Sequence, residues 1–146
     1  MAVFYINGRE TEVTKNQKLL RYLRDTLHLT SVKDGCSECA CGACTVLIDG
    51  EAINSCLYLA VWAEGKNIIT LEGLMNPDGT LSDIQQAFID ETAIQCGFCT
   101  PGFIISAKVL LDKNPNPTRE EVRDWFNKNR NLCRCTGYKP LIDATM

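Results

Sequence analysis

The chain has 146 residues, of which 45% are hydrophobic and 23% charged, with a formal net charge of -3 and a single histidine, His28. This length leaves no room for a large multidomain catalyst, and the mild acidity with scattered Lys and Arg excludes a nucleic-acid partner, which would require a basic patch. No apolar run approaches the roughly 20 residues of a membrane helix and no signal peptide is recognisable, so we expect a cytoplasmic protein that is not embedded in a membrane.

The N-terminal half is predicted to contain short strands and two helices. Val3–Ile6 followed by Asn7-Gly8 predicts a strand that enters a tight hairpin, and Thr45–Ile48 followed by Asp49-Gly50 repeats this signal. A helix with one apolar face is expected from the spacing of Leu19, Leu20, Leu23 and Leu27. A second short helix is expected at Leu57–Ala63, and a last strand at Ile68–Leu71. This order is typical of a small mixed sheet that grasps one helix.

The C-terminal half is predicted to be helical. Ser82-x-x-Gln85 and Thr118-x-x-Glu121 fit capping boxes, and Thr100-Pro101 supplies an N-cap and a first-turn proline for a third helix. The apolar residues on the inner faces of the first two are Ile84, Phe88, Val122, Trp125 and Phe126. The turn residues of Asn76-Pro77-Asp78-Gly79 mark the boundary, which gives domains at 1–76 and 77–146.

The nine cysteines are the main chemical feature of the sequence. Nine in 146 residues is about 6%, below the roughly 8–10% of a disulfide scaffold, so metal binding or redox chemistry is the expected use. With one histidine, a Rieske cluster and a two-histidine iron site are excluded. Any metal must therefore be held almost wholly by thiolates.

The first cysteine group contains Cys36, Cys39, Cys41, Cys44 and Cys56. Without Cys39, the other four have the C-x4-C-x2-C…C spacing of a plant-type [2Fe-2S] cluster. The alternative is a four-cysteine zinc site. Since zinc ribbons more often pair two C-x2-C knuckles, the spacing favours iron–sulfur.

The second group combines Cys96-Gly97-Phe98-Cys99 with Cys133-Arg134-Cys135. Zinc is a stronger competitor here, because two closely spaced pairs also form a zinc knuckle. Cys99 precedes the helix expected at Pro101, so the positive end of that helix dipole would face an anionic cluster. Arg134 adds positive charge nearby. These charges favour a redox cluster, and the odd cysteine count argues against disulfides.

Three ordered motifs carry a family resemblance. They are Asp34-Gly35-Cys36 through Cys41-Gly42-Ala43-Cys44-Thr45-Val46, then Gln95–Gly102, then Asn131–Tyr138. Together they resemble the iron–sulfur subunit of molybdenum hydroxylases, the xanthine dehydrogenase and aldehyde oxidoreductase family. The stretch from Ser55 to Gly65 most resembles bacterial xanthine dehydrogenase subunits. The implied fold is α+β: a plant-type ferredoxin-like β-grasp domain followed by an all-α four-helix-bundle [2Fe-2S] domain.

The resemblance implies two ligand sets. Cys36, Cys41, Cys44 and Cys56 match the ligands of the ferredoxin-like cluster, which faces the flavin in the family. The ligands of the helical-domain cluster, beside the molybdopterin cofactor, are matched by Cys96, Cys99, Cys133 and Cys135. Gln95 matches a residue that hydrogen-bonds the pterin, and Cys135 also lies at the pterin edge. If the motif is disregarded, the expected interpretation of Gln95 is a solvated polar residue before a turn.

The implied function is electron transfer. In such enzymes, oxygen from water is added to a C–H bond at molybdenum, and two electrons leave through both clusters to FAD and then to NAD or another acceptor. The chain has no G-x-G-x-x-G, no P-loop and no credible nucleophile pair, so we expect no catalytic residue of its own. The expected partners are a molybdenum subunit with molybdopterin cytosine dinucleotide and a FAD subunit, in a hetero-oligomer such as a dimer of heterotrimers.

The expected substrate is a purine such as xanthine. Nicotinate or another N-heterocycle, an aldehyde, CO and 4-hydroxybenzoyl-CoA are alternatives within the family, and a free ferredoxin-type carrier or a zinc-stapled interaction module are alternatives outside it. Two residues depart from the family pattern. Cys39 and Arg130 stand where glycine is usual, and ligand exchange between Cys41 and Cys39 is an open alternative.

Overall fold

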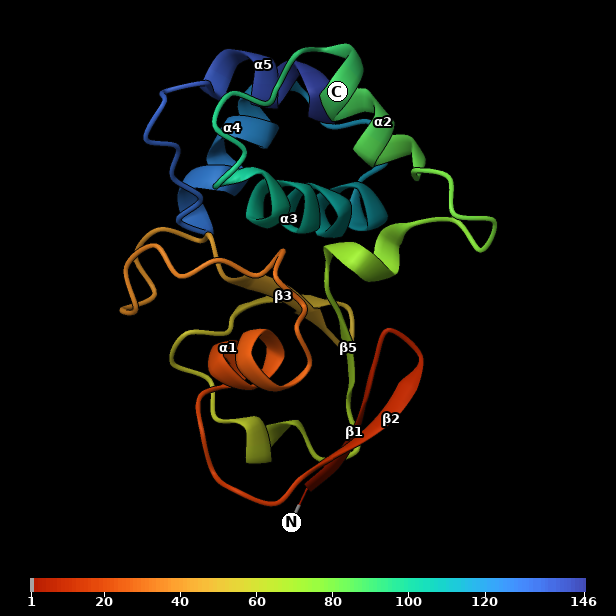
Figure 1. The fold of residues 1–146 in the computed structure, drawn as a ribbon. Coiled ribbons are helices and arrows are strands. Elements are labelled where there is room, and N and C mark those ends of the chain that lie inside the picture. Colours follow the sequence, from red (N-terminus) through yellow and green to blue (C-terminus); the bar gives the residue numbers. More distant parts are fainter. Residues whose placement is uncertain (1) are drawn as a thin grey trace.

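The computed structural model describes residues 2–146, and its two halves pack on each other (Figure 1). The N-terminal half is a five-stranded mixed sheet with the order β2-β1-β5-β3-β4. Its strands are β1 Ala2–Ile6, β2 Arg9–Val13, β3 Thr45–Ile48, β4 Glu51–Asn54 and β5 Asn67–Ile69. β1 and β5 run parallel, whereas the other neighbouring pairs are antiparallel.

Both predicted hairpins are confirmed. Asn7 and Gly8 have φ values of 51° and 83°, and Asp49 and Gly50 have 48° and 86°. Positive φ at both central residues is what a two-residue hairpin turn of the favoured twist requires, and Asn, Asp and Gly tolerate it. The local sequence therefore determines both turns.

The leucine-rich segment forms one α-helical turn, α1 (Leu19–Arg21), and then continues as a π-helical turn over Tyr22–Thr26. The Leu27 N–H donates to the Tyr22 carbonyl, five residues back, at 3.1 Å. Apolar spacing of three and four residues predicted the buried face correctly. This spacing does not distinguish an α-helical from a π-helical turn, since both keep these side chains on the sheet.

Two predicted elements are shorter than expected. Within Leu57–Ala63 only Ala60–Ala63 is helical, as a 3-10 turn, because the preceding residues pair as extended chain: Leu59 bridges to Lys18, and the Leu19 N–H donates to the Tyr58 carbonyl. The strand expected to reach residue 71 ends at Ile69, and a 3-10 turn follows at Leu71–Leu74.

The C-terminal half contains α2 (Asp83–Asp90), α3 (Thr100–Lys113), α4 (Arg119–Lys128) and α5 (Tyr138–Thr145). Both capping boxes are confirmed; at α4 the Glu121 N–H donates to Thr118 Oγ1 at 3.2 Å, and the Thr118 N–H donates to the Glu121 carboxylate at 2.7 Å. Helix α3 begins one residue earlier than predicted, so its N-cap is Cys99.

The sheet separates two hydrophobic cores. One core lies between α1 and the sheet, and the other surrounds α3, which packs against the opposite face of the sheet below α4 and α5 (Figure 1). Strand β3 is buried along its whole length: Val46 and Ile48 face the first core, and Leu47 faces the second. The two halves therefore share this strand.

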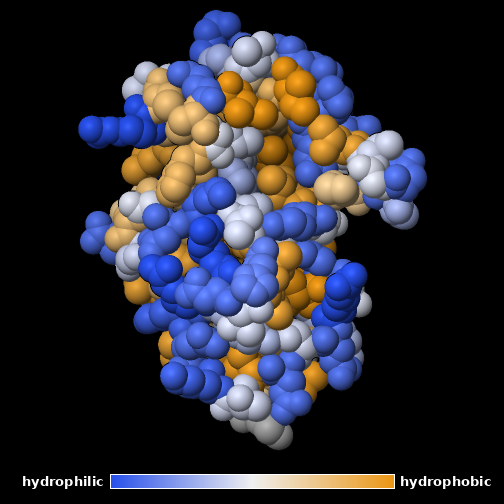
Figure 2. Space-filling model, in the orientation of Figure 1, coloured by the Kyte–Doolittle hydropathy of each residue, from blue (hydrophilic) through white to orange (hydrophobic). Residues whose placement is uncertain are grey.

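The surface of the helical half exposes more apolar side chains than that of the sheet half in the view of Figure 2. Its large exposed hydrophobic residues are Leu81, Ile89, Ile94, Phe98, Leu132, Tyr138 and Met146. Within residues 2–146 no helix has both the length and the apolar character needed to cross a membrane.

Candidate metal centres

The first cysteine group lies in the loop between α1 and β3 and at the end of β4. Ser37, Cys39 and Gly42 all have positive φ, which coils this loop tightly. The Cys36 thiol lies close to Cys41, and the Cys44 thiol lies close to Cys56. The structure therefore brings together all four predicted ligands of this group, in two pairs.

Backbone N–H groups point at the sulfur atoms of this loop. The N–H groups of Glu38 and Ala40 donate to Cys36 Sγ at 3.4 and 3.2 Å, and that of Ala43 donates to Cys41 Sγ at 3.4 Å. Burial alone would raise the pKa of the Cys36 thiol, but these N–H donors outweigh it and hold the pKa below its ordinary value. Donors of this kind stabilise the thiolate form, which is the form that ligates metal.

The second group is assembled at the N-terminus of α3. Cys99 caps the helix, Cys96 precedes it, and Cys133 and Cys135 come from the loop between α4 and α5. The Cys99 thiol lies close to Cys133, and the Cys96 thiol lies close to Cys135. All four predicted residues again meet in pairs.

Each group combines a thiol whose pKa is lowered with a thiol whose pKa is raised. Burial raises the pKa of Cys44 and of Cys99 to about 12, and the neighbouring thiols Cys56 and Cys133 add to these shifts. A backbone hydrogen bond from Phe98 lowers the pKa of the exposed Cys96 thiol. Metal binding would therefore displace protons from Cys44 and Cys99, the thiols with the raised pKa.

The pairing of the thiols bears on which metal the two sites fit. A [2Fe-2S] cluster takes two thiolates on each of its two irons, whereas a structural zinc ion draws four thiolates to one centre. Two pairs per group fit the binuclear cluster.

The two cysteine groups adjoin one another. A pocket of about 460 Å³ between them is lined by Gly35, Cys41 and Ala43 on one side and by residues of the second group on the other, namely Cys96, Phe98, Cys99, Leu132, Cys133, Arg134 and Tyr138. The Leu132 N–H donates to the Cys41 carbonyl at 2.9 Å. This hydrogen bond connects the first cysteine loop to the loop that carries Cys133.

Two further contacts at this junction were missed by the sequence analysis. The first turn of α3 touches the first cysteine loop at Gly102, where a side chain would collide with the Gly42 backbone. Asn131 is only 3% exposed, and neither its Oδ1 nor its Nδ2 has a hydrogen-bond partner among residues 2–146. Buried amides normally have partners, which makes the two unpaired atoms of Asn131 unusual. In the sequence, only the glycines at positions 42 and 102 could have indicated the first of these contacts.

The residues predicted from the resemblance alone have definite positions. Gln95 is exposed beside the second group, with its side chain against Gly137. Its contact with a pterin stays a prediction. Cys39 and Arg130 have φ values of 60° and 56°, so both positions adopt the left-handed conformation that favours glycine. The Cys39 thiol lies beside Cys56, 3.7 Å away.

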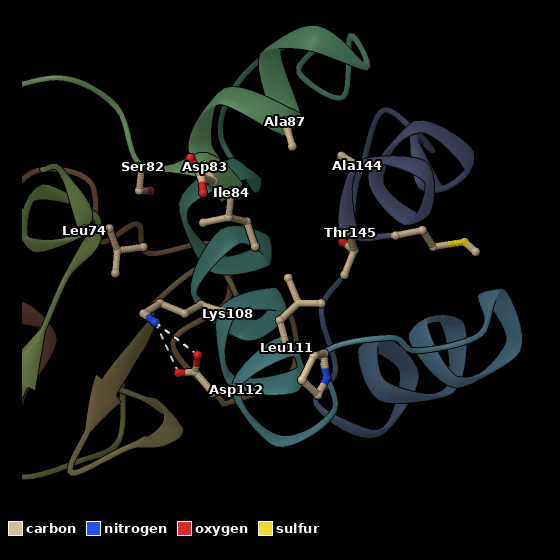
Figure 3. Close-up of a pocket in the computed structure, with 12 residues that line it drawn as sticks. Leu74, Ser82, Asp83, Ile84, Ala87, Lys108, Leu111, Asp112, Ala144 and Thr145 are labelled. Carbon is tan, nitrogen blue, oxygen red and sulfur yellow. Dashed lines mark hydrogen bonds and ion pairs between the residues drawn. The ribbon is translucent and has the colours of Figure 1, made fainter.

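A second cavity, of about 600 Å³, opens between α2, α3 and the end of α5 (Figure 3). Apolar residues such as Ile84 and Leu111 line it, and Lys108 pairs with Asp112 at 3.1 Å. No cysteine is among its lining residues, so it is separate from the candidate metal centres.

Comparisons with known proteins agree with this geometry. A model of the 2Fe-2S iron–sulfur cluster binding domain matches residues 4–69, and a model of the [2Fe-2S] binding domain matches residues 70–146. The xanthine dehydrogenase iron–sulfur-binding subunit of Escherichia coli is 52% identical over 81% of this chain and 74% of that protein. The nicotinate dehydrogenase small FeS subunit of Eubacterium barkeri is 50% identical over 91% of this chain and 84% of that protein.

Solved structures give the same result. The aldehyde oxidoreductase from Desulfovibrio gigas superposes with a TM-score of 0.92 and 48% identity over 99% of this chain. The chain spans only 16% of that protein but most of the separate small subunits. The expected order of a ferredoxin-like domain and a helical domain is confirmed. The chain belongs to the two-domain [2Fe-2S] iron–sulfur subunits of the molybdenum hydroxylase family.

Proposed function

We propose that this chain carries two [2Fe-2S] clusters and passes electrons from a molybdenum-cofactor subunit to a FAD subunit. Cys36, Cys41, Cys44 and Cys56 would hold one cluster, and Cys96, Cys99, Cys133 and Cys135 would hold the other. Support comes from the four thiol pairs and from the two matching domain families. When bound, each cluster supplies a site that accepts and releases one electron.

The observation that carries the proposal is the direct connection between the two groups. The hydrogen bond from Leu132 to the Cys41 carbonyl and the pocket shared by Cys41 and Cys133 keep the two sites adjacent. Cys44, Cys56 and Cys133 are buried, so the protein excludes water from part of each site. The positive end of α3 at Cys99 favours the negative charge that thiolates bring.

The direction of transfer rests on the exposed parts of each group. The exposed residues Gln95 and Cys96, with the partly exposed Cys135, present the second group to the surface, where we expect molybdopterin cytosine dinucleotide of the molybdenum subunit to make contact. The first group would then face FAD. No residue of this chain is assigned to substrate chemistry. We place the division between the two cluster-binding units at residue 76, giving 1–76 and 77–146, of which residue 1 lies outside the described part.

The substrate belongs to the molybdenum subunit. We propose a purine such as xanthine, because a xanthine dehydrogenase subunit is 52% identical. The nicotinate dehydrogenase subunit, at 50%, and the aldehyde oxidoreductase, at 48%, make an N-heterocycle or an aldehyde the next candidates. We also propose a cytoplasmic hetero-oligomer, in line with nine free thiols.

Metal analysis tests the cluster assignment. The purified chain should contain about four irons and four sulfides, two of each per cluster, and reduction should give two distinct electron paramagnetic resonance (EPR) signals. Cys44→Ala should remove one signal and Cys99→Ala the other, while the control Lys15→Ala, at an exposed residue outside both cysteine loops, keeps both. A colourless chain with zinc and no iron would refute the proposal.

Isolation of the complex tests the partners. A tag on this chain should recover protein that contains molybdenum and flavin, and the recovered complex is then assayed with xanthine, nicotinate and aldehydes. Recovery of the chain alone, with both clusters, would identify a free ferredoxin-type carrier instead.

A further inference from the structure

The ninth cysteine, Cys39, is outside both proposed ligand sets but contacts one of their members twice. Its Sγ lies 3.7 Å from Cys56 Sγ, and its backbone N–H donates to the same sulfur at 3.3 Å. Cys56 is buried, whereas Cys39 is half-buried against the first core. Both contacts of Cys39 therefore act on a single proposed ligand.

The backbone at Cys39 shows what the side chain adds. Its φ of 60° is in the left-handed region, where a residue other than glycine is strained. Glycine would adopt this conformation without strain and would still donate the N–H to Cys56 Sγ. Glycine would lack the side chain, and the thiol is the only hydrogen-bonding group of that side chain.

The chemistry of the pair determines which sulfur donates. A ligating cysteine is a thiolate, which has no proton and can only accept. A neutral thiol carries one S–H donor. In a contact between a ligand and a free thiol, the free thiol must therefore be the donor.

We propose that the Cys39 thiol donates a hydrogen bond to Cys56 Sγ and that it is thereby a positioning residue that raises the reduction potential of the N-terminal cluster. The reduced cluster has one more negative charge than the oxidised cluster, so a donor at a ligand sulfur stabilises the reduced form more. This inference rests on the proposed assignment of Cys56 as a ligand.

The test compares Cys39→Gly, Cys39→Ala and Cys39→Ser in the full chain with both clusters. Cys39→Gly removes the thiol and relieves the backbone strain, while Cys39→Ser keeps a donor. A redox titration followed by EPR gives the midpoint potential of each cluster in one sample, so the C-terminal cluster is the internal control.

Cys39→Gly and Cys39→Ala should each change the ratio of reduced to oxidised N-terminal cluster about fivefold at a fixed potential. This corresponds to a decrease of roughly 40 mV, at 59 mV per tenfold for one electron. Cys39→Ser should retain most of the wild-type potential. The C-terminal cluster should not change in any variant.

Three results would overturn the inference. The first is an unchanged potential in both Cys39→Gly and Cys39→Ala. The second is an equal decrease in Cys39→Ser, which would show that the donor is not the cause. The third is loss of half the iron in Cys39→Gly, which would make Cys39 a ligand. Absence of both clusters from the unmutated chain would refute the proposed function instead.

Discussion

Gly102, in the first turn of α3, is the position where the helical half touches the first cysteine loop. A methyl group there would overlap the Gly42 carbonyl oxygen and would lie 3.2 Å from the Gly42 carbonyl carbon and 3.3 Å from Ala43 Cα. All three are backbone atoms, which cannot avoid the overlap by a change of rotamer as a flexible side chain can. To restore ordinary contacts, the loop must retreat by about 1 Å.

Whether Gly102→Ala raises or lowers the stability shows whether this contact exists. In a free helix, alanine would stabilise relative to glycine by up to about 1 kcal/mol. Forcing an extra carbon into a packed contact costs about 1–3 kcal/mol. Because the overlap is with backbone atoms, the upper part of that cost applies, and we expect net destabilisation by roughly 2 kcal/mol. Each kcal/mol lowers the melting temperature of a protein of this size by about 2–4 °C.

Two measurements on the same protein check this expectation. Urea unfolding gives the change in stability, and hydrogen exchange follows the Leu132 amide, whose bond to the Cys41 carbonyl should weaken as the loop retreats. Lys108→Ala, in the same helix, is the control and should change stability by less than about 0.5 kcal/mol. If Gly102→Ala is more stable than the wild type, or if the Leu132 amide keeps its protection, the argued contact does not exist.

Three further predictions concern single side chains. In the cluster-free chain at pH 7, Cys96, whose pKa is lowered by a backbone hydrogen bond, should react with iodoacetamide about tenfold faster than Cys99, whose pKa burial raises to about 12. Trp125→Phe removes the Nε1–H bonds to the Ser106 carbonyl and hydroxyl, at 2.9 and 3.0 Å, and should cost about 1–2 kcal/mol in urea unfolding. Thr118→Ala breaks the capping box of α4 and should cost about 1 kcal/mol in the same assay.

Each of these has a clear contrary result. Peptide mapping that finds equal labelling of Cys96 and Cys99 would contradict the difference in acidity. Unchanged stability of Trp125→Phe would show that the indole hydrogen bonds contribute nothing. For the cap, the exposed control Glu120→Ala should change stability by less than about 0.5 kcal/mol, and an equal loss in both variants would rule out a specific capping effect.

Local sequence signals predicted the elements that local chemistry determines. Both hairpins and both capping boxes depend on residues within three or four positions of each other, and all four are confirmed. The extended chain before Ala60 was missed because its conformation comes from pairing with Lys18, far away in the sequence. No periodicity within residues 57–63 carries that information.

The same distinction applies to the candidate site. Cysteine spacing identified the eight proposed ligands, since each group is built largely from short loops. The contact of Gly102 with Gly42, the buried Asn131 and the approach of Cys39 to Cys56 each join segments that are distant in sequence. Such contacts follow from how the loops pack, which motif spacing does not describe.

Strand β3 belongs to both hydrophobic cores, and this has a mechanical consequence. Val46 and Ile48 anchor the strand on one side and Leu47 on the other, so turning the helices against the sheet would expose apolar side chains of β3 in one core or the other. In the proposed complex, a partner bound to the helices would therefore also constrain the orientation of the sheet. The subunit would then act as a spacer that sets the distance and the angle between its two neighbours.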